Sequence, residues 1–515
     1  MTQEQFNKLD KCYFNYSLND RCVEEVADAR ILLGTHRFDL YAILFYIDQK
    51  VKGVSDLNYA REIYKERTRA MTGFKLSEIG NSNKTSFEIF IKVLDQLISD
   101  FQNGKYDFEK TLIPIDKKGE PIDGAHRISC AAYFNKKVKV LRFLDQEITP
   151  YDYRYLKHEL MPSCVGDIMA LEALKWHNDI YALFLWPKAI KKQDKLQEAL
   201  KLIRCQTDVL YQVEYKLSFE AIINLMIQLY GHMDWVGTID DGFANITGKA
   251  DEVWDGNGKV QIVLTRANNC SKILSIKSQI RELFGIGLSS IHSTDNMRET
   301  IMAMNALLNP NSRHHLLNAD VKRYKESYKL MTSFKEILIT NNFDLDEFII
   351  DSSIVLSIYG LRAARDLDYY CLHNKQDRQY PCGTDIEEHD SSQKKFYSLP
   401  VRDLILNPNN YFVYNELKFV TLNNLLQFKQ NRYRLYHDIK DIEDIKLIQN
   451  TLREDNKLRK NFTRVCLMLK RKKRIYKHSI FVNLINVSKK LHVYEPLRVL
   501  KNRIYRICNL YHFKQ

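Results

Sequence analysis

The chain contains few of the residues that form long flexible linkers. Only 18 Gly and 10 Pro occur among its 515 residues, so extended linkers between folded parts are not expected. Hydrophobic residues make up 45% and charged residues 27% of the chain, a balance that excludes a collagen and a wholly disordered protein. At about 150 residues per domain, the length predicts about three folded domains.

Cysteine patterns typical of metal sites or disulfide frameworks are absent as well. The 10 Cys are scattered and form no Cys-x-x-Cys pair, and no Cys/His spacing resembles a zinc site. The N-terminal stretch MTQEQFNKLDK lacks a basic region followed by an apolar one. No apolar run approaches the roughly 18 residues needed to span a bilayer. We therefore expect a cytoplasmic protein with reduced thiols.

Acidic residues are nearly missing from the C-terminal tail. Residues 457–515 hold 17 Lys and Arg but one acid, Glu495, whereas residues 1–456 hold 60 Lys and Arg against 63 Asp and Glu. The body therefore has a net charge of −3 and the tail one of +16. A body that binds nucleic acid should itself be basic, so this charge distribution disfavours nucleic-acid binding by residues 1–456.

The tail combines its charge with two amphipathic patterns. Apolar residues recur at helical spacing from Leu458 to Leu469 and from Leu497 to Tyr511, on either side of the basic run Lys470–Arg474. Such helices flanking a basic cluster are typical of peripheral attachment to an anionic membrane surface. Nucleic acid is a less favoured partner for the same cluster, and a solvated, partly ordered C-terminus is the third interpretation.

The remaining pattern predicts a multidomain α/β (α+β) protein. Residues 1–70 read as helices, and two strands, TLIPID and KVKVLRF, follow within 1–150. Residues 151–330 read as helical up to 235 and then as a βαβα unit over 259–308. Residues 331–456 read as a third α/β module with a hairpin in YFVYNELKFVT. The basic helical tail, 457–515, completes this division.

A tight turn between a strand and a helix carries the first candidate site. The segment LIPIDKKGEPIDGAHRISCAAYF contains Asp123, Gly124, His126 and Arg127. Gly124 lets backbone amides approach an anion, and the start of the helix supplies partial positive charge. Arg127 can bind a phosphate bidentately, while Asp123 or His126 could transfer a proton. A surface turn with a capping Asp is the structural alternative.

Through this D-G-x-H-R signature, residues of about 70–145 resemble the ParB/sulfiredoxin-like superfamily. The resemblance implies a nucleotide-phosphate site at Asp123, Gly124, His126 and Arg127. It implies no single reaction, because some members bind DNA and hydrolyse CTP, some phosphorylate free serine, and some reduce a sulfinic acid.

A second candidate site lies in IIDSSIVLSIYGLRAARDLDYY. Asp366 and Asp368 are two apart on a predicted strand, so their side chains point to one side and can hold Mg²⁺ against a triphosphate. The ion would neutralise charge that develops during phosphoryl or nucleotidyl transfer. Nearby residues expected to contact the nucleotide are Ser352, Ser353, Arg362 and Arg365. A salt-bridged strand edge is the structural alternative.

This second pattern resembles the nucleotidyltransferase superfamily that includes antibiotic adenylyltransferases and abortive-infection toxins, over about residues 335–450. Ser352-Ser353 stands where Gly-Ser is usual, and Asp366-Leu367-Asp368 matches the pair of acids. The resemblance implies Mg²⁺ and a nucleoside triphosphate substrate. It also implies a third acid on a later strand, with Asp385, Glu387, Glu388 and Asp390 as candidates. Downstream, the family's K-D-x-x-D ending is matched by Lys440, Asp441 and Asp444.

A third candidate is His292, in Ile291-His292-Ser293-Thr294-Asp295. It falls at the predicted end of the second strand of the βαβα unit, and ligands of open α/β sheets bind at such edges. Ser293, Thr294 and Asp295 would form the N-cap region of the next helix. His292 is therefore a candidate for phosphate contact or general-base catalysis, although a packed histidine beside a capping run is the favoured interpretation.

Two nucleotide-phosphate modules in a neutral body predict an enzyme. The expected activity is phosphoryl or nucleotidyl transfer from a nucleotide to a small-molecule or sugar precursor. The tail would place the protein at the inner membrane face, a combination that suits bacterial surface polysaccharide biosynthesis. The alternatives are a nucleic-acid-directed ParB-like nuclease, an abortive-infection-type nucleotidyltransferase toxin, and a non-catalytic nucleotide-binding scaffold.

Overall fold

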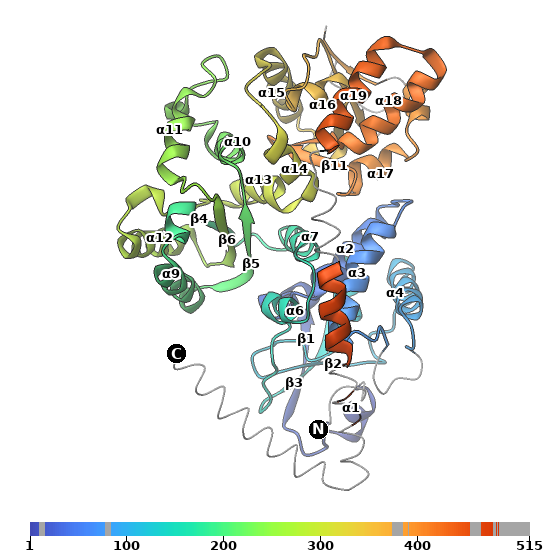
Figure 1. Cartoon of the computed structure of the whole chain (residues 1–515). Coiled ribbons are helices and arrows are strands. Elements are labelled where there is room, and N and C mark those ends of the chain that lie inside the picture. The colour runs from blue at the N-terminus through green and yellow to red at the C-terminus, as the bar shows by residue number, and fades with distance from the viewer. Residues whose placement is uncertain are drawn as a thin grey trace.

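The computed structural model describes residues 1–9, 16–77, 84–372, 385–389, 391–453 and 465–476, together with 480 and 483. Within them the chain is a mixed α/β protein whose three sheets come from successive parts of the sequence (Figure 1). A continuous hydrophobic core extends from Ala29 to Ile448 and joins these parts. Among the described residues, no helix has both the length and the apolar character needed to cross a bilayer.

The N-terminal sheet has the order β1-β3-β2, with β1 antiparallel and β2 parallel to β3. Its strands are β1 (Cys22–Asp28), β2 (Ile113–Ile115) and β3 (Lys137–Phe143). The accompanying helices are α1 (Gln3–Asn7), α2 (Leu40–Val51), α3 (Asn58–Met71), α4 (Phe87–Gln102) and α5 (Ala125–Tyr133). Strand β1 corrects the expectation that residues 1–70 are helical. Because β1 is an edge strand, Val23 and Val26 are exposed, and its sequence shows no buried apolar face from which a strand could be predicted.

The central sheet is antiparallel throughout and has the order β5-β6-β4-β7. Its strands are β4 (Ile180–Leu185), β5 (Asp208–Lys216), β6 (Lys259–Arg266) and β7 (Ile291–Ser293). The helices of this region are α6 (Tyr153–His158), α7 (Ser163–Ala173), α8 (Pro187–Ile190), α9 (Gln193–Gln206), α10 (Phe219–Tyr230), α11 (Ala244–Val253), α12 (Cys270–Phe284), α13 (Met297–Leu308) and α14 (Pro310–Asn318).

One expectation for this region was wrong, and another is confirmed in its order along the chain. Strands β4 and β5 occupy a stretch that was expected to be mostly helical. Residues of β4 face two different cores, with Ala182 and Phe184 on one side and Leu183 and Leu185 on the other. A strand buried on both faces is a continuous apolar run, which periodicity cannot distinguish from a buried helix. The predicted βαβα order is present as β6, α12, β7 and α13, although β4 lies between β6 and β7 in the sheet.

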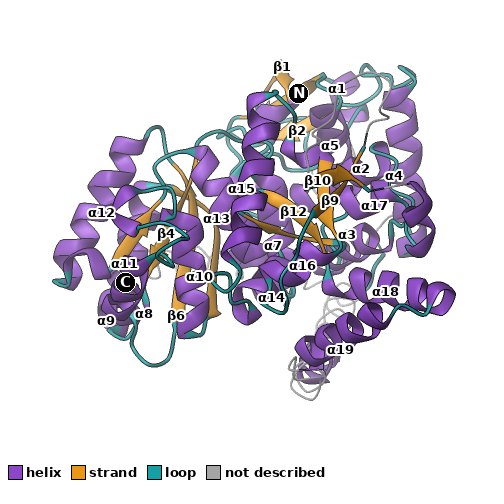
Figure 2. Ribbon diagram, turned by 90° about the horizontal axis from the view of Figure 1, so that it is seen from above, coloured by secondary structure: helices purple, strands orange, loops and turns teal. Residues whose placement is uncertain are grey.

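The third sheet is mixed and has the order β10-β9-β8-β12-β11. Its strands are β8 (Phe348–Asp351), β9 (Leu367–Cys371), β10 (Ile386–Glu388), β11 (Tyr411–Tyr414) and β12 (Leu417–Val420). Around it are α15 (Lys325–Thr340), α16 (Ser353–Ile358), α17 (Val401–Leu406), α18 (Leu422–Tyr436) and α19 (Ile439–Arg453), and α18 and α19 lie side by side (Figure 2). The predicted hairpin is present, with Asn415 and Glu416 at φ 50° and 68° between β11 and β12.

A helix over residues 465–476 lies beside α3 and α6, where Figure 1 shows it in red. Arg471 pairs with Glu66 of α3, and Arg474 pairs with Glu159 just after α6, each at 2.6 Å. Two charges of the 470–474 cluster are therefore engaged by the body, whereas Lys472 and Lys473 are exposed. Because positions three apart share one helix face, these two arginines point inward together. The apolar pattern from Leu497 to Tyr511 lies outside the described residues.

Candidate functional site

The turn at Asp123–Arg127 has the backbone that its sequence predicts. Gly124 is the N-cap residue of α5 and has φ +86°, a left-handed conformation. A Cβ atom at this position would lie 3.3 Å from Nη2 of Arg127 and 3.4 Å from Cγ1 of Ile113. A side chain here would therefore be strained and crowded, and glycine keeps the start of the helix accessible.

This turn opens onto a cavity of about 710 Å³ enclosed by α3, α4, α5 and the loops before and after them. Six basic residues contribute to its lining: Arg37, Arg67, Lys84, Lys105, Lys110 and Arg127. The acidic lining residues are Asp100, Asp107 and Asp123, so the formal charge of the lining is +3. Aromatic side chains also line it: Phe90, Tyr106, Tyr151 and Tyr155. A positive cavity within a slightly acidic body is a site suited to an anion.

Arg127 lies at this cavity and is held only loosely by its neighbours. Its Nη1 donates to the carbonyl of Leu112 over 3.4 Å, and its Nη2 lies 3.9 Å from Oδ2 of Asp123. These are long contacts compared with the 2.7–2.9 Å that is typical of a charge-assisted hydrogen bond. The guanidinium can therefore turn toward a bound phosphate without breaking a strong ion pair.

His126 faces the aromatic side of the cavity. Its Nε2 lies 2.5 Å from Oη of Tyr64, and its ring packs against Tyr64 and Phe90. Burial, followed by the charges of Arg67 and Lys84, holds the pKa of His126 well below its ordinary value. The ring is therefore uncharged at neutral pH, and proton transfer by His126 or Asp123 stays a prediction.

The second candidate site begins with an unusual backbone at Ser352. This residue precedes α16 and has φ 63° and ψ −138°, a conformation that glycine adopts easily and other residues rarely. Ser352 stands where the pattern it resembles has glycine, and its backbone has a conformation that glycine adopts easily. Strained residues of this kind cluster at functional sites.

Asp366 lies one residue before β9 and is exposed, so the two acids do not share the strand as expected, but Asp366 does lie against Ser353. Ser353 Oγ donates to Oδ1 of Asp366 over 3.1 Å, and the nearby Ser352 hydroxyl acts to lower the pKa of Asp368. Burial raises the pKa of Asp368, with the charges of Asp366 and Asp351 adding to the effect and His389 opposing it. Negative charge at this point is thus only partly compensated, and a cation would relieve it.

The donor set fits Mg²⁺ in part. Two carboxylates are the number that proteins commonly offer this ion, with substrate phosphates and water completing its shell. Among the described residues, no three His, Cys, Asp or Glu side chains converge as a metal cluster. Of the candidates for a third acid, Glu387 is the one in register with Asp368, on the adjacent parallel strand β10. Asp390 lies outside the described residues.

Sequence reasoning missed a buried cluster beside these acids. Asp351, the last residue of β8, pairs in register with Asp368 and is fully buried. Its carboxylate accepts a hydrogen bond from Oη of Tyr397 and lies 3.2 Å from Nδ1 of His389. The signal was present in the D-S-S sequence, where an acid ends an apolar strand, but no spacing connects it with His389 or Tyr397.

Arg362 was expected near a phosphate but is already engaged. Its Nη2 donates to Asp444 of α19 over 3.0 Å and its Nε binds the same carboxylate. Asp441 and Asp444 are both buried and also contact Lys429. The K-D-x-x-D ending therefore holds α18, α19 and the loop before β9 together. Arg365, by contrast, remains exposed.

His292 lies on β7 between two aromatic rings. The ring centroids of Phe184 and Tyr230 are 5.5 and 5.1 Å from that of His292. Burial, with the charges of Lys277 and Arg281, lowers the pKa of His292 to about 3. This environment favours the packed-histidine interpretation, because so weak a base holds no proton near neutral pH.

The run that follows His292 does not cap the next helix as expected. The N-cap of α13 is Asn296, whose side chain accepts from the backbone N–H of Glu299. Thr294 is buried instead, and its Oγ1 accepts from the backbone N–H of Ala182 over 2.9 Å. The hydroxyl therefore ties β7 to β4 and is not available to a phosphate.

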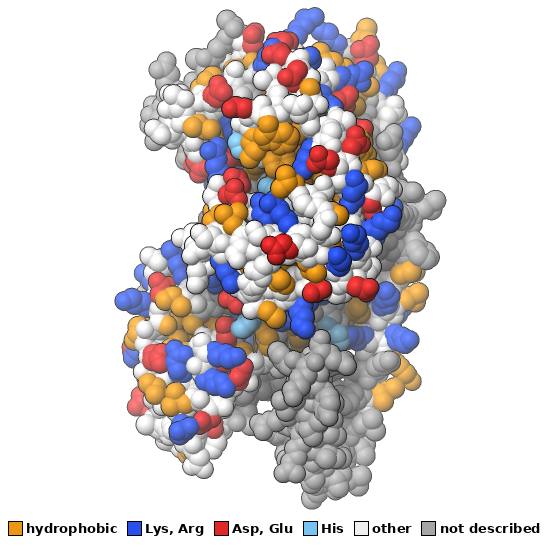
Figure 3. Space-filling model, turned by 90° about the vertical axis from the view of Figure 1, so that its left-hand side faces the viewer, with side chains coloured by type: hydrophobic (Ala, Val, Ile, Leu, Met, Phe, Trp, Pro, Cys, Tyr) orange, Lys and Arg blue, Asp and Glu red, His pale blue; other side chains and the backbone are white. Residues whose placement is uncertain are grey.

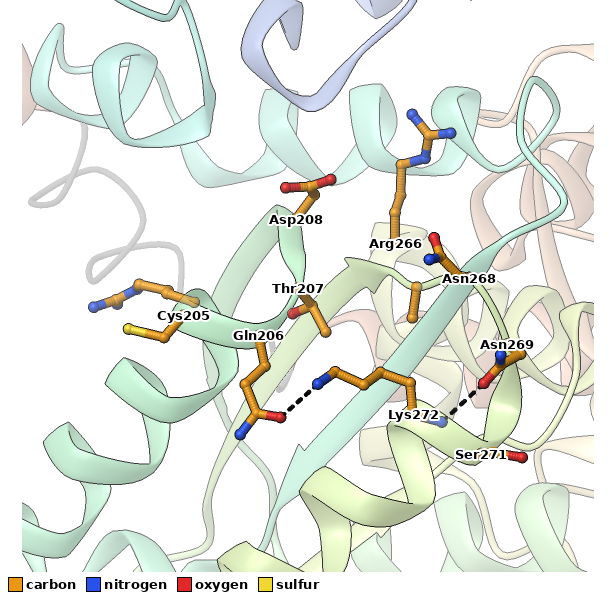
Figure 4. Close-up of a pocket in the computed structure, with 11 residues that line it drawn as sticks. Cys205, Gln206, Thr207, Asp208, Arg266, Asn268, Asn269, Ser271 and Lys272 are labelled. Atoms are coloured by element: carbon orange, nitrogen blue, oxygen red, sulfur yellow. Dashed lines mark hydrogen bonds between the residues drawn. The ribbon is translucent and has the colours of Figure 1, made fainter.

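Another hollow, of about 620 Å³, lies at the edge of the central sheet near the start of α12 (Figure 4). Lys272 reaches across it, and its Nζ donates to Oε1 of Gln206 over 2.8 Å. The backbone N–H of Lys272 donates to the side chain of Asn269, and Arg266 pairs with Asp179. These polar groups satisfy one another, so this hollow gives no indication of a ligand.

Comparisons with known proteins support neither of the two family resemblances. No family model matches the chain, and neither a curated protein nor a solved structure matches it. On the face shown in Figure 3, basic and acidic side chains are interspersed rather than gathered by sign. Function must therefore be argued from the two sites themselves.

Proposed function

We propose that this chain is a nucleotide-dependent phosphoryl- or nucleotidyl-transferase that binds nucleotide phosphates in the cavity at Asp123–Arg127. The observation that carries this proposal is the left-handed glycine turn opening onto a cavity of about 710 Å³ with a lining charge of +3. The start of α5 offers backbone N–H groups to an anion, and Arg127 offers a bidentate partner. The volume is within the range of small-molecule sites.

The aromatic lining suits the remainder of a nucleotide. Phe90, Tyr106, Tyr151 and Tyr155 contribute apolar faces and three hydroxyls to the same cavity. Rings of this kind stack on nucleobases, and hydroxyls can bond a sugar or base edge. The cavity therefore combines a phosphate-binding end with surfaces suited to a nucleoside.

Calorimetric titration with ATP and with CTP tests this binding. Arg127→Ala should weaken binding of the preferred nucleotide by roughly 1.5–3 kcal/mol, about ten- to a hundredfold, since a charge-assisted contact is lost. Arg154→Ala is the matched control, because Arg154 is exposed and pairs locally with Asp152. Unchanged affinity in the Arg127 variant would contradict the proposal.

We propose a second nucleotide-phosphate site at Asp366 and Asp368, which do not line the cavity at Asp123–Arg127, and place metal-dependent transfer at this second site. The glycine-like backbone of Ser352, the Ser353–Asp366 hydrogen bond and the only partly compensated charge at Asp368 support this assignment. Mg²⁺, when bound by the two carboxylates, would supply charge neutralisation on the phosphates. Ser353 holds Asp366 in place, so the pair is preorganised for a cation. An acceptor oxygen would then bond to phosphorus as the bond to the leaving phosphate breaks.

The net charge of residues 1–456 favours a small molecule or sugar precursor as the acceptor. Residues 1–456 have a net charge of −3, and a nucleic-acid acceptor would call for a basic face. The basic tail would hold the enzyme at the inner membrane face. Activation of a precursor for bacterial surface polysaccharide is therefore the setting that we propose.

A further inference from the structure

The cavity at Asp123–Arg127 is lined by a second arginine that the D-G-x-H-R signature does not include. Arg67 of α3 is 5% exposed, and its Nη2 donates to Oδ2 of Asp39. Among the described residues, its buried Nε has no hydrogen-bond partner. Leaving such a group unpaired costs about 1–3 kcal/mol, so the guanidinium of this cavity-lining residue keeps one donor that a ligand could satisfy.

Asp39 connects this arginine to the turn. Its carboxylate is fully buried and binds both Arg37 and Arg67. Arg37 in turn donates from Nη1 to the carbonyl of Pro121 over 2.8 Å, two residues before Asp123. Although burial favours the protonated acid, the charges of Arg37 and Arg67 lower the pKa of Asp39 to about 2. Asp39 is therefore ionised and fixes Arg67 relative to the phosphate-binding turn.

The charge of this trio is unbalanced. One carboxylate faces two guanidinium groups, which leaves a buried net charge of +1 beside the cavity. Buried charges in proteins are normally paired, and an unpaired one is costly. Arg67 and Arg127 both lie near His126, since the positive charge of each lowers the pKa of its ring. The two arginines thus act on the same region of the cavity.

We infer that Arg67 is a second phosphate-binding residue, positioned by Asp39, and that the cavity takes a ligand with two or more linked phosphate groups. One phosphate binds at the turn and Arg127, and the next binds at Nε of Arg67. This inference rests on the proposed function and narrows its ligand to the class of nucleoside diphosphates and triphosphates. A monophosphate cannot occupy both positions.

Calorimetry with orthophosphate, pyrophosphate and tripolyphosphate tests the inference without a nucleobase. The wild-type protein should bind pyrophosphate at least about tenfold more tightly than orthophosphate, because only the linked ligand gains the second charge-assisted contact. This comparison requires no variant. Equal affinities would overturn the inference.

Arg67→Lys keeps a positive charge beside Asp39 but removes Nε. It should lower the affinity for pyrophosphate and tripolyphosphate about tenfold and leave orthophosphate within about twofold. Arg61→Lys is the control, because Arg61 is on the same helix but pairs with Glu88 at the surface. Arg127→Ala should weaken all three ligands.

The outcomes separate the two proposals. If Arg127→Ala weakens binding and Arg67→Lys does not, with its melting temperature preserved, the inference on Arg67 fails and the proposed function stands. If the wild-type protein binds none of the three anions, both fail.

Discussion

Nδ1 of His389 lies 3.2 Å from Oδ2 of Asp351, which joins the segment after β10 to the end of β8. The same carboxylate accepts a hydrogen bond from Tyr397, and the His389 ring stacks on Tyr370 with centroids 5.2 Å apart. This buried contact lies beside the Asp366–Asp368 pair and gives the third module a pH-dependent element.

The stability of this module should fall as His389 loses its proton. Burial opposes the charged ring, but the bond and the charges of Asp351 and Asp368 raise the pKa of His389 overall. The stabilisation is therefore fully present below the unfolded-state pKa, about 6.5, and is lost as pH rises through the higher folded-state pKa. We expect the difference in unfolding free energy between wild type and His389→Gln to shrink from pH 6 to pH 9. A difference that stays constant over that range would contradict this, and His232→Gln, an exposed change, is the control.

Asp368→Asn should separate binding from stability. Because the raised pKa of Asp368 shows that its charge is disfavoured in the fold, the neutral amide should leave the melting temperature unchanged or slightly higher. Mg²⁺-dependent binding of nucleotide should nevertheless be lost, and Asp366→Asn should abolish this binding as well. Thermal unfolding with and without Mg²⁺ and ATP measures both effects. Glu443→Gln, an exposed change on α19, is the control, and a variant that retains metal-dependent binding would refute the site.

Asp444→Ala should destabilise the protein strongly. The Asp444 carboxylate is 1% exposed and holds Arg362 and Lys429. Removing one partner of a buried ion pair typically costs about 3–5 kcal/mol, because the remaining charges stay buried. Urea unfolding should show this loss, whereas Lys440→Ala, at an exposed neighbour, should change stability by less than about 0.5 kcal/mol. A small effect of Asp444→Ala would mean that these acids are not structural.

The tail should attach the protein to anionic membranes through its outward lysines. Full-length protein should co-sediment with phosphatidylserine vesicles, and a chain that ends at Asn456 should not. Lys472→Gln with Lys473→Gln should weaken attachment by about 2 kcal/mol, at about 1 kcal/mol per charge. Arg471→Gln with Arg474→Gln should weaken it less, because these arginines pair with Glu66 and Glu159.

Salt and RNA separate the interpretations of the tail. Attachment through charge should weaken as ionic strength rises, since screening shortens the field. Equal sedimentation of the full-length and shortened chains would refute the membrane role. If a trace of added RNA abolishes binding of the protein to vesicles, nucleic acid would instead be favoured as the partner.

The local elements near both sites could be predicted because their signals are local. KVKVLRF forms β3, as predicted, and Asn415-Glu416 lies at the tip of the predicted hairpin. The glycine at 124 and the two-residue spacing of Asp366 and Asp368 likewise depend on nearest neighbours. By contrast, β1 and β4 are defined by partners far along the chain: Glu25 pairs with Arg142, and β4 is inserted between β6 and β7.

The sequence by itself determined the strand–turn–helix that presents Arg127, the acid pair at the start of β9 and the separation of charge between body and tail, because each follows from residue type and short spacing. Only the tertiary structure decided which groups surround them. It brought Asp39 and Arg67 to the first turn, His389 and Tyr397 to Asp351, and Asp444 to Arg362. These pairings join residues 28 to 82 positions apart. They arise because a buried charge must find its partner wherever packing places one.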